Sequence, residues 1–401
     1  MRRIRFLPLL LIALLLLACG GQKQGNDAVQ GNDAVAITAD DVVLKVGEEP
    51  VYAVVYRHQL SDRLSAINEH GLYDRETYLS YVANPNVVYN RAYYDTRTDE
   101  GMRALASDVL NELALEAAAI DAGTKAGYRL AGLEQSYLYQ ARENALDVLD
   151  GLMKANGGTY DSPEAFYAET GFTEDRFVEM YVRSMEAGIL YDRLLTDYKA
   201  SHTLTEEELQ TGYVRIAEAT FKDRYTAGMY AQYLAYYMAG RRPFPSLYVP
   251  DGAIFVRLFV KTDPTEEETA AIAEQAEADF NALYAGAENE FTAQGTAGDL
   301  AVAPNDSLVD GLYEAAKDVP IGSVGTMRTE KDGKTTCYWF LRVPGETGVV
   351  PIDRYPGVRE SIASQLLGTA CMDTLRETVN DPAVTVRNEE LITAIVSGLK
   401  N

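Results

Sequence analysis

The stretch AIFVRLFV, residues 253–260, marks the point where the chain changes from a helical to a β pattern. Every residue in it is apolar except Arg257, and the run is typical of a strand. The segment Arg241-Arg242-Pro243-Phe244-Pro245 lies just before it and ends a long region of helical spacing. We therefore expect an α+β multidomain fold that is mainly helical, with a small α+β domain inserted at residues 250–345.

Local signals after this strand complete the inserted domain. Thr265 and Glu268 are spaced as a capping box for a helix that reaches about residue 284. A short helix is expected over 308–317, followed by strands over 324–328 and 335–343. The segment Lys331-Asp332-Gly333-Lys334 joins these strands, and its Asp-Gly pair suits a tight hairpin turn.

Upstream, apolar residues recur at three- and four-residue steps from about residue 98 to 240. Gly123 is expected to end the first helix of this region. Ser162-Pro163 and Thr173 predict the starts of two later helices, and Thr205 with Glu208 predicts a capping box for another. A short strand at 42–46 and a turn at 47–50 precede these helices. Together they predict a helical domain over 41–245.

The end of the chain predicts a helix at about 354–378, then a short extended segment at 383–386 and a last helix at 389–399.

The first 18 residues have the features of an export signal. Arg2, Arg3 and Arg5 precede an apolar run that ends at Ala18. This run is shorter than the roughly 20 residues that a membrane-spanning helix needs. The sequence Leu16-Leu17-Ala18-Cys19-Gly20 resembles the bacterial lipobox, which implies that Cys19 becomes the acylated first residue. Residues 19–40 predict a flexible tether, so the chain is expected on the extracytoplasmic face of the cell membrane.

Composition excludes some classes of partner. The chain has 401 residues and a formal net charge of −24. Such a charge argues against binding to nucleic acid, whose phosphates require a basic surface. The chain has no CxxC pair, no His pair at metal-ligand spacing and no phosphate-binding glycine loop. The sequence therefore predicts no metal and no cofactor. After Cys19, only Cys337 and Cys371 remain, and the sequence leaves open whether they form a disulfide.

The order of these segments resembles the PrsA/SurA family of extracytoplasmic foldases. The family's early β-turn falls on Leu44-Lys45-Val46-Gly47-Glu48-Glu49-Pro50-Val51, although the usual Asn or Asp before Gly is absent. Thr205-Glu206-Glu207-Glu208-Leu209 and Tyr213 match a later family motif. The resemblance covers about residues 42–401 and implies that the helix and strand of residues 351–401 return to the helical domain. It also implies a chaperone whose partners are unfolded or newly exported polypeptides.

The inserted domain resembles a parvulin prolyl isomerase with a degenerate site. The two core histidines of the family fall on Arg257 and Trp339, and its Met and Phe of the proline pocket fall on Leu308 and Leu312. Gly298-Asp299-Leu300 matches a family Gly-Asp-Leu motif, so Asp299 is the fifth position equivalent to a parvulin site residue. Arg257 cannot alternate between donor and acceptor as imidazole does, and Trp339 is only a donor. The resemblance therefore implies weak or lost isomerase activity.

Tyrosine is unusually frequent, with 27 Tyr against 11 Phe and one Trp. Tyr230, Tyr233 and Tyr237 share one face of an expected helix, which suits either a surface for unfolded segments or ordinary helix packing. Two other functions stay open at this stage. One is an active prolyl isomerase with a different polar set around Asp299, and the other is a lipoprotein that binds a small solute.

Overall fold

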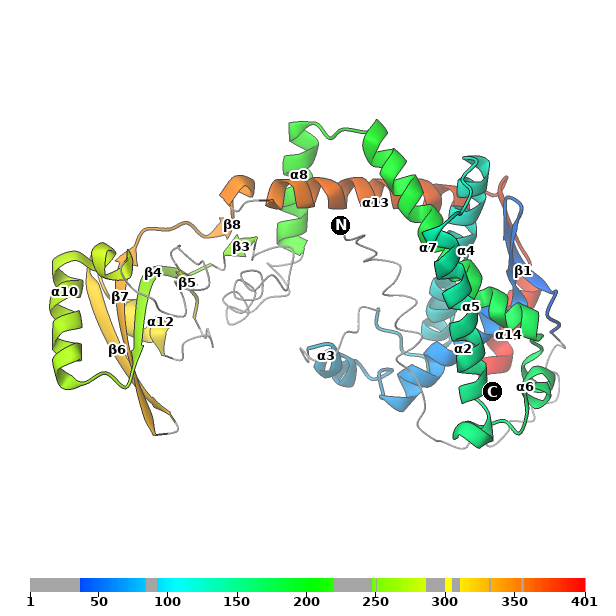
Figure 1. The fold of residues 1–401 in the computed structure, drawn as a ribbon, viewed down its shortest axis with the longest axis horizontal. Helices are drawn as coiled ribbons and strands as arrows, with labels where there is room; N and C mark the ends of the chain where they lie inside the picture. Colours follow the sequence, from blue (N-terminus) through cyan, green and yellow to red (C-terminus); the bar gives the residue numbers. More distant parts are fainter. Residues whose placement is uncertain are drawn as a thin grey trace. The chain divides into compact units, whose positions relative to one another are not determined.

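The computed structural model describes residues 37–83, 92–219, 247–249, 251–285, 300–304, 311–331, 333–354 and 357–400 (Figure 1). They form two compact units. The first comprises the chain up to His202 together with the chain from Gly368, and the second comprises Thr203–Leu367. Both α-helices and small antiparallel sheets are present. The expected fold class, mainly helical with an inserted α+β domain, is confirmed. The expected signal segment, Cys19 and most of the tether lie outside the described residues.

The first unit is built around a three-stranded sheet in the order β2-β1-β9. β1 (Val42–Val46) pairs antiparallel with β2 (Glu49–Tyr52) on one side and with β9 (Thr385–Arg387) on the other. A strand from the end of the chain therefore completes a sheet that begins near its start.

The turn between β1 and β2 lacks the usual Asn or Asp before Gly47, and a distant carboxylate lies against it. Gly47 has a φ of 59°, which favours glycine. The carboxylate of Asp121, from a helix far along the chain, accepts a hydrogen bond from the Glu48 N–H at 3.4 Å. A Cβ atom at Gly47 would lie 2.3 Å from Asp121 Oδ1. A carboxylate that is distant in sequence thus contacts this turn directly.

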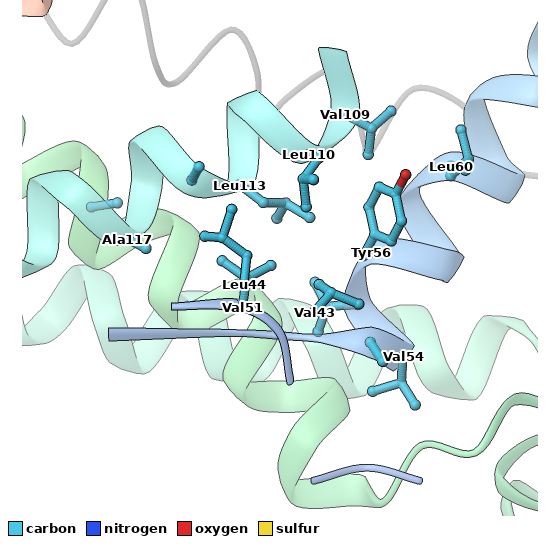
Figure 2. Close-up of a cluster of buried hydrophobic side chains, with 14 of the residues drawn as sticks. Val43, Leu44, Val51, Val54, Tyr56, Leu60, Val109, Leu110, Leu113 and Ala117 are labelled. Carbon is cyan, nitrogen blue, oxygen red and sulfur yellow. The ribbon is translucent and has the colours of Figure 1, made fainter. Parts of the chain in front are cut away.

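Helices cover this sheet and supply most of the core. The helices of the unit are α2 (Ala53–Glu69), α3 (Arg75–Ala83), α4 (Asp99–Lys125), α5 (Leu133–Gly151), α6 (Pro163–Thr170), α7 (Glu174–Ser201), the second half of α13 (Val358–Asn380) and α14 (Glu389–Lys400). Of these, α2, α4 and α14 pack directly on the sheet. Figure 2 shows Leu44 and Val51 from the strands, Tyr56 from α2 and Leu113 from α4 gathered in one cluster. Full burial of such side chains contributes about 1.5–3 kcal/mol each. This shared core holds the first unit together.

The structure corrects the expected helix end at Gly123. α4 continues to Lys125, and Gly123 lies inside it. A Cβ atom at Gly123 would lie 2.9 Å from Leu190 Cδ2. The glycine therefore allows α7 to approach α4 closely, and it does not stop the helix.

The predicted caps are confirmed. Ser162 caps α6 and Thr173 caps α7, each by accepting a backbone hydrogen bond. Thr205 and Glu208 form the capping box of α8 (Glu206–Ala217). Thr265 and Glu268 bond reciprocally at the start of α10 (Glu266–Ala285). Each of these caps bonds to a residue within four positions of the chain. The sequence alone therefore predicts them.

The second unit contains a small helical cluster and the inserted domain. α8, the short 3₁₀ helix η3 (Ile352–Arg354) and the first half of α13 share a core around Tyr213, whose hydroxyl donates a hydrogen bond to the Val350 carbonyl. The two-stranded pair β3 (Tyr248–Val249) and β8 (Gly348–Val349) brings together the two chain segments that flank the inserted domain.

The inserted domain is a four-stranded antiparallel sheet in the order β5-β4-β7-β6. Its strands are β4 (Ile254–Thr262), β5 (Leu300–Val302), β6 (Val324–Lys331) and β7 (Lys334–Val343). The short helix α12 (Leu312–Ala316) packs on one core cluster of the sheet, and α10 packs on another. The expected β6–β7 hairpin is confirmed, with Lys331 opposite Lys334.

Candidate functional site

Three parvulin-equivalent positions, Arg257, Leu312 and Trp339, lie in the described residues, and they do not share one face of the inserted sheet. Trp339 is 2% exposed and packs with Phe280 and Cys337 in the core cluster formed by α10. Leu312 is fully buried with Leu258 and Phe340 in the core cluster formed by α12. Trp339 and Phe340 are neighbours in β7, so their side chains point to opposite faces of the sheet. Each of them belongs to one of the two clusters. Leu312 and Trp339 therefore lie on opposite sides of the sheet.

Arg257 lies on the same face as Trp339. β4 and β7 pair so that Arg257 is opposite Leu341, and Phe259 is opposite Trp339. The Arg257 guanidinium donates a hydrogen bond to Asn281 Oδ1 of α10 and lies 6.0 Å from the ring centre of Tyr284. The side chain is thus engaged with α10, and it lies away from the face where α12 packs.

The other predicted site residues lie outside the described residues. These are Asp299 and Leu308 of the parvulin-equivalent set, the lipidation residue Cys19, and the peptide-binding candidates Tyr230, Tyr233 and Tyr237. Their roles stay predictions.

A cleft in the first unit escaped the sequence analysis. It lies between β2, α2, α4 and α7, and apolar side chains such as Val51, Ile120 and Met180 line much of it. Its cavity volume is about 30 Å³, which is room for about one water molecule. Sites for drug-sized ligands have volumes of about 300–1,000 Å³. The cleft is therefore too small to hold such a solute as it stands.

Glu116 is the unusual residue of this cleft. It accepts a hydrogen bond from Ser184 Oγ at 2.9 Å, and both side chains are partly buried. Burial raises the pKa of the Glu116 carboxyl from 4.5 to about 7. The nearby Glu112 raises this pKa further, whereas the Ser184 hydrogen bond and the guanidinium groups of Arg183 and Arg63 lower it. Because Glu116 sits at an ordinary helical spacing, only its tertiary neighbours reveal the perturbation.

The two arginines of the cleft are already engaged. Arg183 lies 2.8 Å from Glu49 Oε2 and 3.8 Å from Glu179 Oε1. Arg176 lies over the Tyr52 ring at 3.3 Å and forms an ion pair with Asp40 at 2.8 Å. These contacts fasten the start of the described chain and the β2 strand to α7. The arrangement stabilises the first unit and offers no ready anion site.

The described residues include two thiols, Cys337 and Cys371. Cys337 and Cys371 are free, buried thiols that belong to different units. Across the described ranges, no cluster of three or more His, Cys, Asp or Glu residues could hold a metal ion. None of the helices described is both long and apolar enough to cross a membrane.

Comparisons with known proteins give structural matches alone. No protein-family model matches the chain, and no curated protein matches it. Among solved structures, it is similar to the foldase protein PrsA of Streptococcus pneumoniae, with 12% identity over 76% of this chain and 85% of that one, at a TM-score of 0.21. PrsA of Lactococcus lactis matches with 9% identity over 90% of this chain and all (100%) of that one, at a TM-score of 0.24.

A SurA-like chaperone of Campylobacter jejuni matches with 12% identity over 84% of this chain and 93% of that one, at a TM-score of 0.18. The matched structures are PrsA foldases and a SurA-like chaperone, the proteins that the sequence motifs resemble. At these identities and TM-scores the matches carry no function over to this chain.

Proposed function

We propose that this chain is a membrane-anchored extracytoplasmic chaperone that binds unfolded exported proteins, with prolyl isomerase activity weak or lost. The observation that carries the proposal is the state of the inserted domain. It contains a four-stranded antiparallel sheet, yet Arg257 is engaged with Asn281 and Trp339 is buried in a packed core. A protein that retains this sheet without the paired imidazoles is better suited to binding polypeptide than to isomerising it.

The small cavity in the first unit supports the same choice. A solute-binding lipoprotein needs an enclosed site of several hundred Å³, whereas the cleft around Glu116 has room for about one water molecule. The chaperone proposal needs no such cavity, because an unfolded segment binds along an exposed surface.

Membrane attachment through Cys19 is part of the proposal and rests on the lipobox-like sequence. Stable anchoring requires more than one acyl chain, because a single chain binds membranes reversibly. We expect palmitate labelling of the chain in cells, and its loss in the Cys19→Ala variant. Equal labelling of parent and variant would contradict the anchor.

The chaperone activity is tested with the full chain carried in lipid nanodiscs. We expect it to suppress aggregation of a chemically unfolded protein at near-stoichiometric ratios, whereas empty nanodiscs do not. Absence of suppression would overturn the chaperone proposal.

The isomerase part needs a separate assay. The same preparation should accelerate cis–trans exchange of a proline peptide little, if at all. The Arg257→His, Trp339→His double variant should not restore catalysis, because both positions face α10 and Leu312 packs on the other side of the sheet. A rate near that of active parvulins would contradict the loss of isomerase activity.

A further inference from the structure

An aromatic surface surrounds α3 at the end of α2. Its side chains, which we call the aromatic platform, are His70, Tyr73, Tyr78, Leu79, Tyr81 and Tyr93. Leu79 is 53% exposed, and Tyr78 and Tyr81 are partly exposed. Figure 1 shows α3 projecting away from α4, α5 and α7. Tyr73 and Tyr81 pack in part against the shared core of the first unit, whereas Leu79 is exposed on α3.

Mutual contacts fix the rings of the platform. His70 stacks on Tyr81 with ring centres 5.2 Å apart, and Tyr78 lies 5.4 Å from Tyr93. The Tyr93 hydroxyl donates a hydrogen bond to the Tyr73 carbonyl at 2.8 Å. Tyrosines held in this way lose little conformational freedom when a partner binds, and they offer both apolar faces and polar tips.

The charges around the platform favour a cationic partner. Residues 69–83 and 92–97 contain four acidic side chains, Glu69, Asp74, Glu76 and Asp95, against two arginines. One of these arginines, Arg97, is bound to Asp95 at 2.8 Å and lies over the Tyr73 ring at 4.8 Å. Glu69, Glu76 and Arg75 are all exposed, and the two ranges together keep a net charge of −2 (two arginines against four acids). Lysine or arginine of a partner would meet carboxylates and ring faces together.

We infer that the aromatic platform binds segments of unfolded polypeptides that combine apolar side chains with lysine or arginine. This inference rests on the proposed chaperone function and assigns it to a surface. Charge also disfavours two other occupants. A second copy of the chain carries the same net charge of −24, and an anionic lipid surface would repel the net negative charge around the platform.

Sequence reasoning placed tyrosine-mediated binding at 230–237 and missed this surface. The signal was present in Tyr73, Tyr78, Tyr81 and Tyr93, but their spacing fits no single helix face. The platform exists because a turn at Gly71 and the return of the chain at residue 92 bring separate segments together.

The test measures binding of labelled peptides to the full chain in lipid nanodiscs. The probe is an unstructured peptide of Leu, Phe and Lys. In one control peptide Glu replaces Lys, and in another Ser replaces Leu and Phe. We expect the parent to prefer the probe over both control peptides. Replacing Tyr78 and Leu79 together by Ser should weaken probe binding about tenfold, as loss of central contacts does at other interfaces.

A matched control removes one Leu and one Tyr elsewhere on the first unit. Leu133 and Tyr139 of α5 are 59% and 65% exposed, and their double replacement by Ser should leave probe binding unchanged. The Glu76→Lys variant keeps the rings and should weaken binding about threefold at low salt, with the difference vanishing at high salt.

The outcomes separate the platform from the chaperone function. If the parent binds the probe and the Tyr78→Ser, Leu79→Ser variant binds it equally well, the platform assignment is wrong and the chaperone proposal stands. If the parent binds no peptide and suppresses no aggregation, both fail. Self-association of the parent that the same double variant abolishes would show that the platform binds a second copy instead.

Discussion

The two units differ in how their apolar side chains are distributed. In the first unit, strands and helices from both ends of the chain share one large buried cluster. In the second unit, the buried side chains form several small clusters, around Tyr213, around Phe340, around Trp339 and around Val249. In a large shared core, the stability of each element depends on packing against the others. In small clusters, the loss of one side chain destabilises only the elements that share its cluster. The first unit should therefore unfold as a whole, and the second in parts.

The largest effect is expected from matched truncations of fully buried phenylalanines. Phe177 contacts the rings of Phe166, Phe172 and Tyr181, and Phe340 lies in the small cluster beneath α12. Either change to Ala should cost about 3–5 kcal/mol. Phe177→Ala should lower the main helical unfolding transition in far-UV circular dichroism, and Phe340→Ala should leave that transition nearly unchanged. Equal loss of helical signal in both variants would contradict the expected difference in unfolding between the two units.

A pH effect is expected in the first unit. The folded-state pKa of Glu116 is about 7, above its unfolded value of 4.5. The folded protein therefore keeps a proton that the unfolded chain has released, and this contribution to stability is present below pH 4.5 and is lost as pH rises through about 7. The loss should be about 1–3 kcal/mol, towards the lower end because Glu116 still borders the open cleft.

The Glu116→Gln variant should remove this part of the pH dependence, because Gln can still accept the Ser184 hydrogen bond and does not ionise. Denaturant unfolding across the pH range measures it. Glu207→Gln, at an exposed position of α8, is the control and should keep the parent profile. An unchanged profile in Glu116→Gln would mean that Glu116 titrates as an ordinary carboxylate.

Glycine substitutions sharpen the comparison further by testing how tightly the first unit is packed. Gly123→Ala would place a Cβ atom 2.9 Å from Leu190, whereas Gly398→Ala in α14 meets nothing within 4 Å. Alanine favours a helix over glycine by about 1 kcal/mol, and overpacking costs about 1–3 kcal/mol. We expect Gly123→Ala to destabilise by about 1 kcal/mol net and Gly398→Ala to be neutral or stabilising. Thermal unfolding of both variants provides the measurement.

The smallest effect should be the same in both units. Thr173 caps α7 in the first unit, and Thr265 caps α10 in the second. Replacing either residue by Ala should cost about 1 kcal/mol, since a cap acts on its own helix end. A large difference between the two would show that caps, too, depend on the surrounding core. Urea unfolding of the two variants decides the point.

The contrast between local and long-range interactions explains how far prediction from sequence could go. Ser162, Thr173 and the capping boxes at Thr205 and Thr265 were predicted because each bonds within four residues. The helix end predicted at Gly123 was wrong, because this glycine makes room for Leu190 of another helix. Arg257 and Trp339 could be assigned to strands, but the identity of the helix covering their face required the paired sheet.

By itself, the sequence determined the fold class, the starts of four helices, the β6–β7 hairpin and the net negative charge, whereas the expectation of an exported chaperone came from the family resemblance. Periodicity, caps and net charge are properties of neighbouring or summed residues, so no tertiary contact is needed to see them. The tertiary structure alone decided that Asp121 supports the Gly47 turn, that Glu116 is pushed toward neutrality, and that Leu312 and Trp339 lie on opposite faces. It also gathered the tyrosines around α3. Each of these depends on groups that are distant in sequence, and burial and pairing arise only when the chain brings them together.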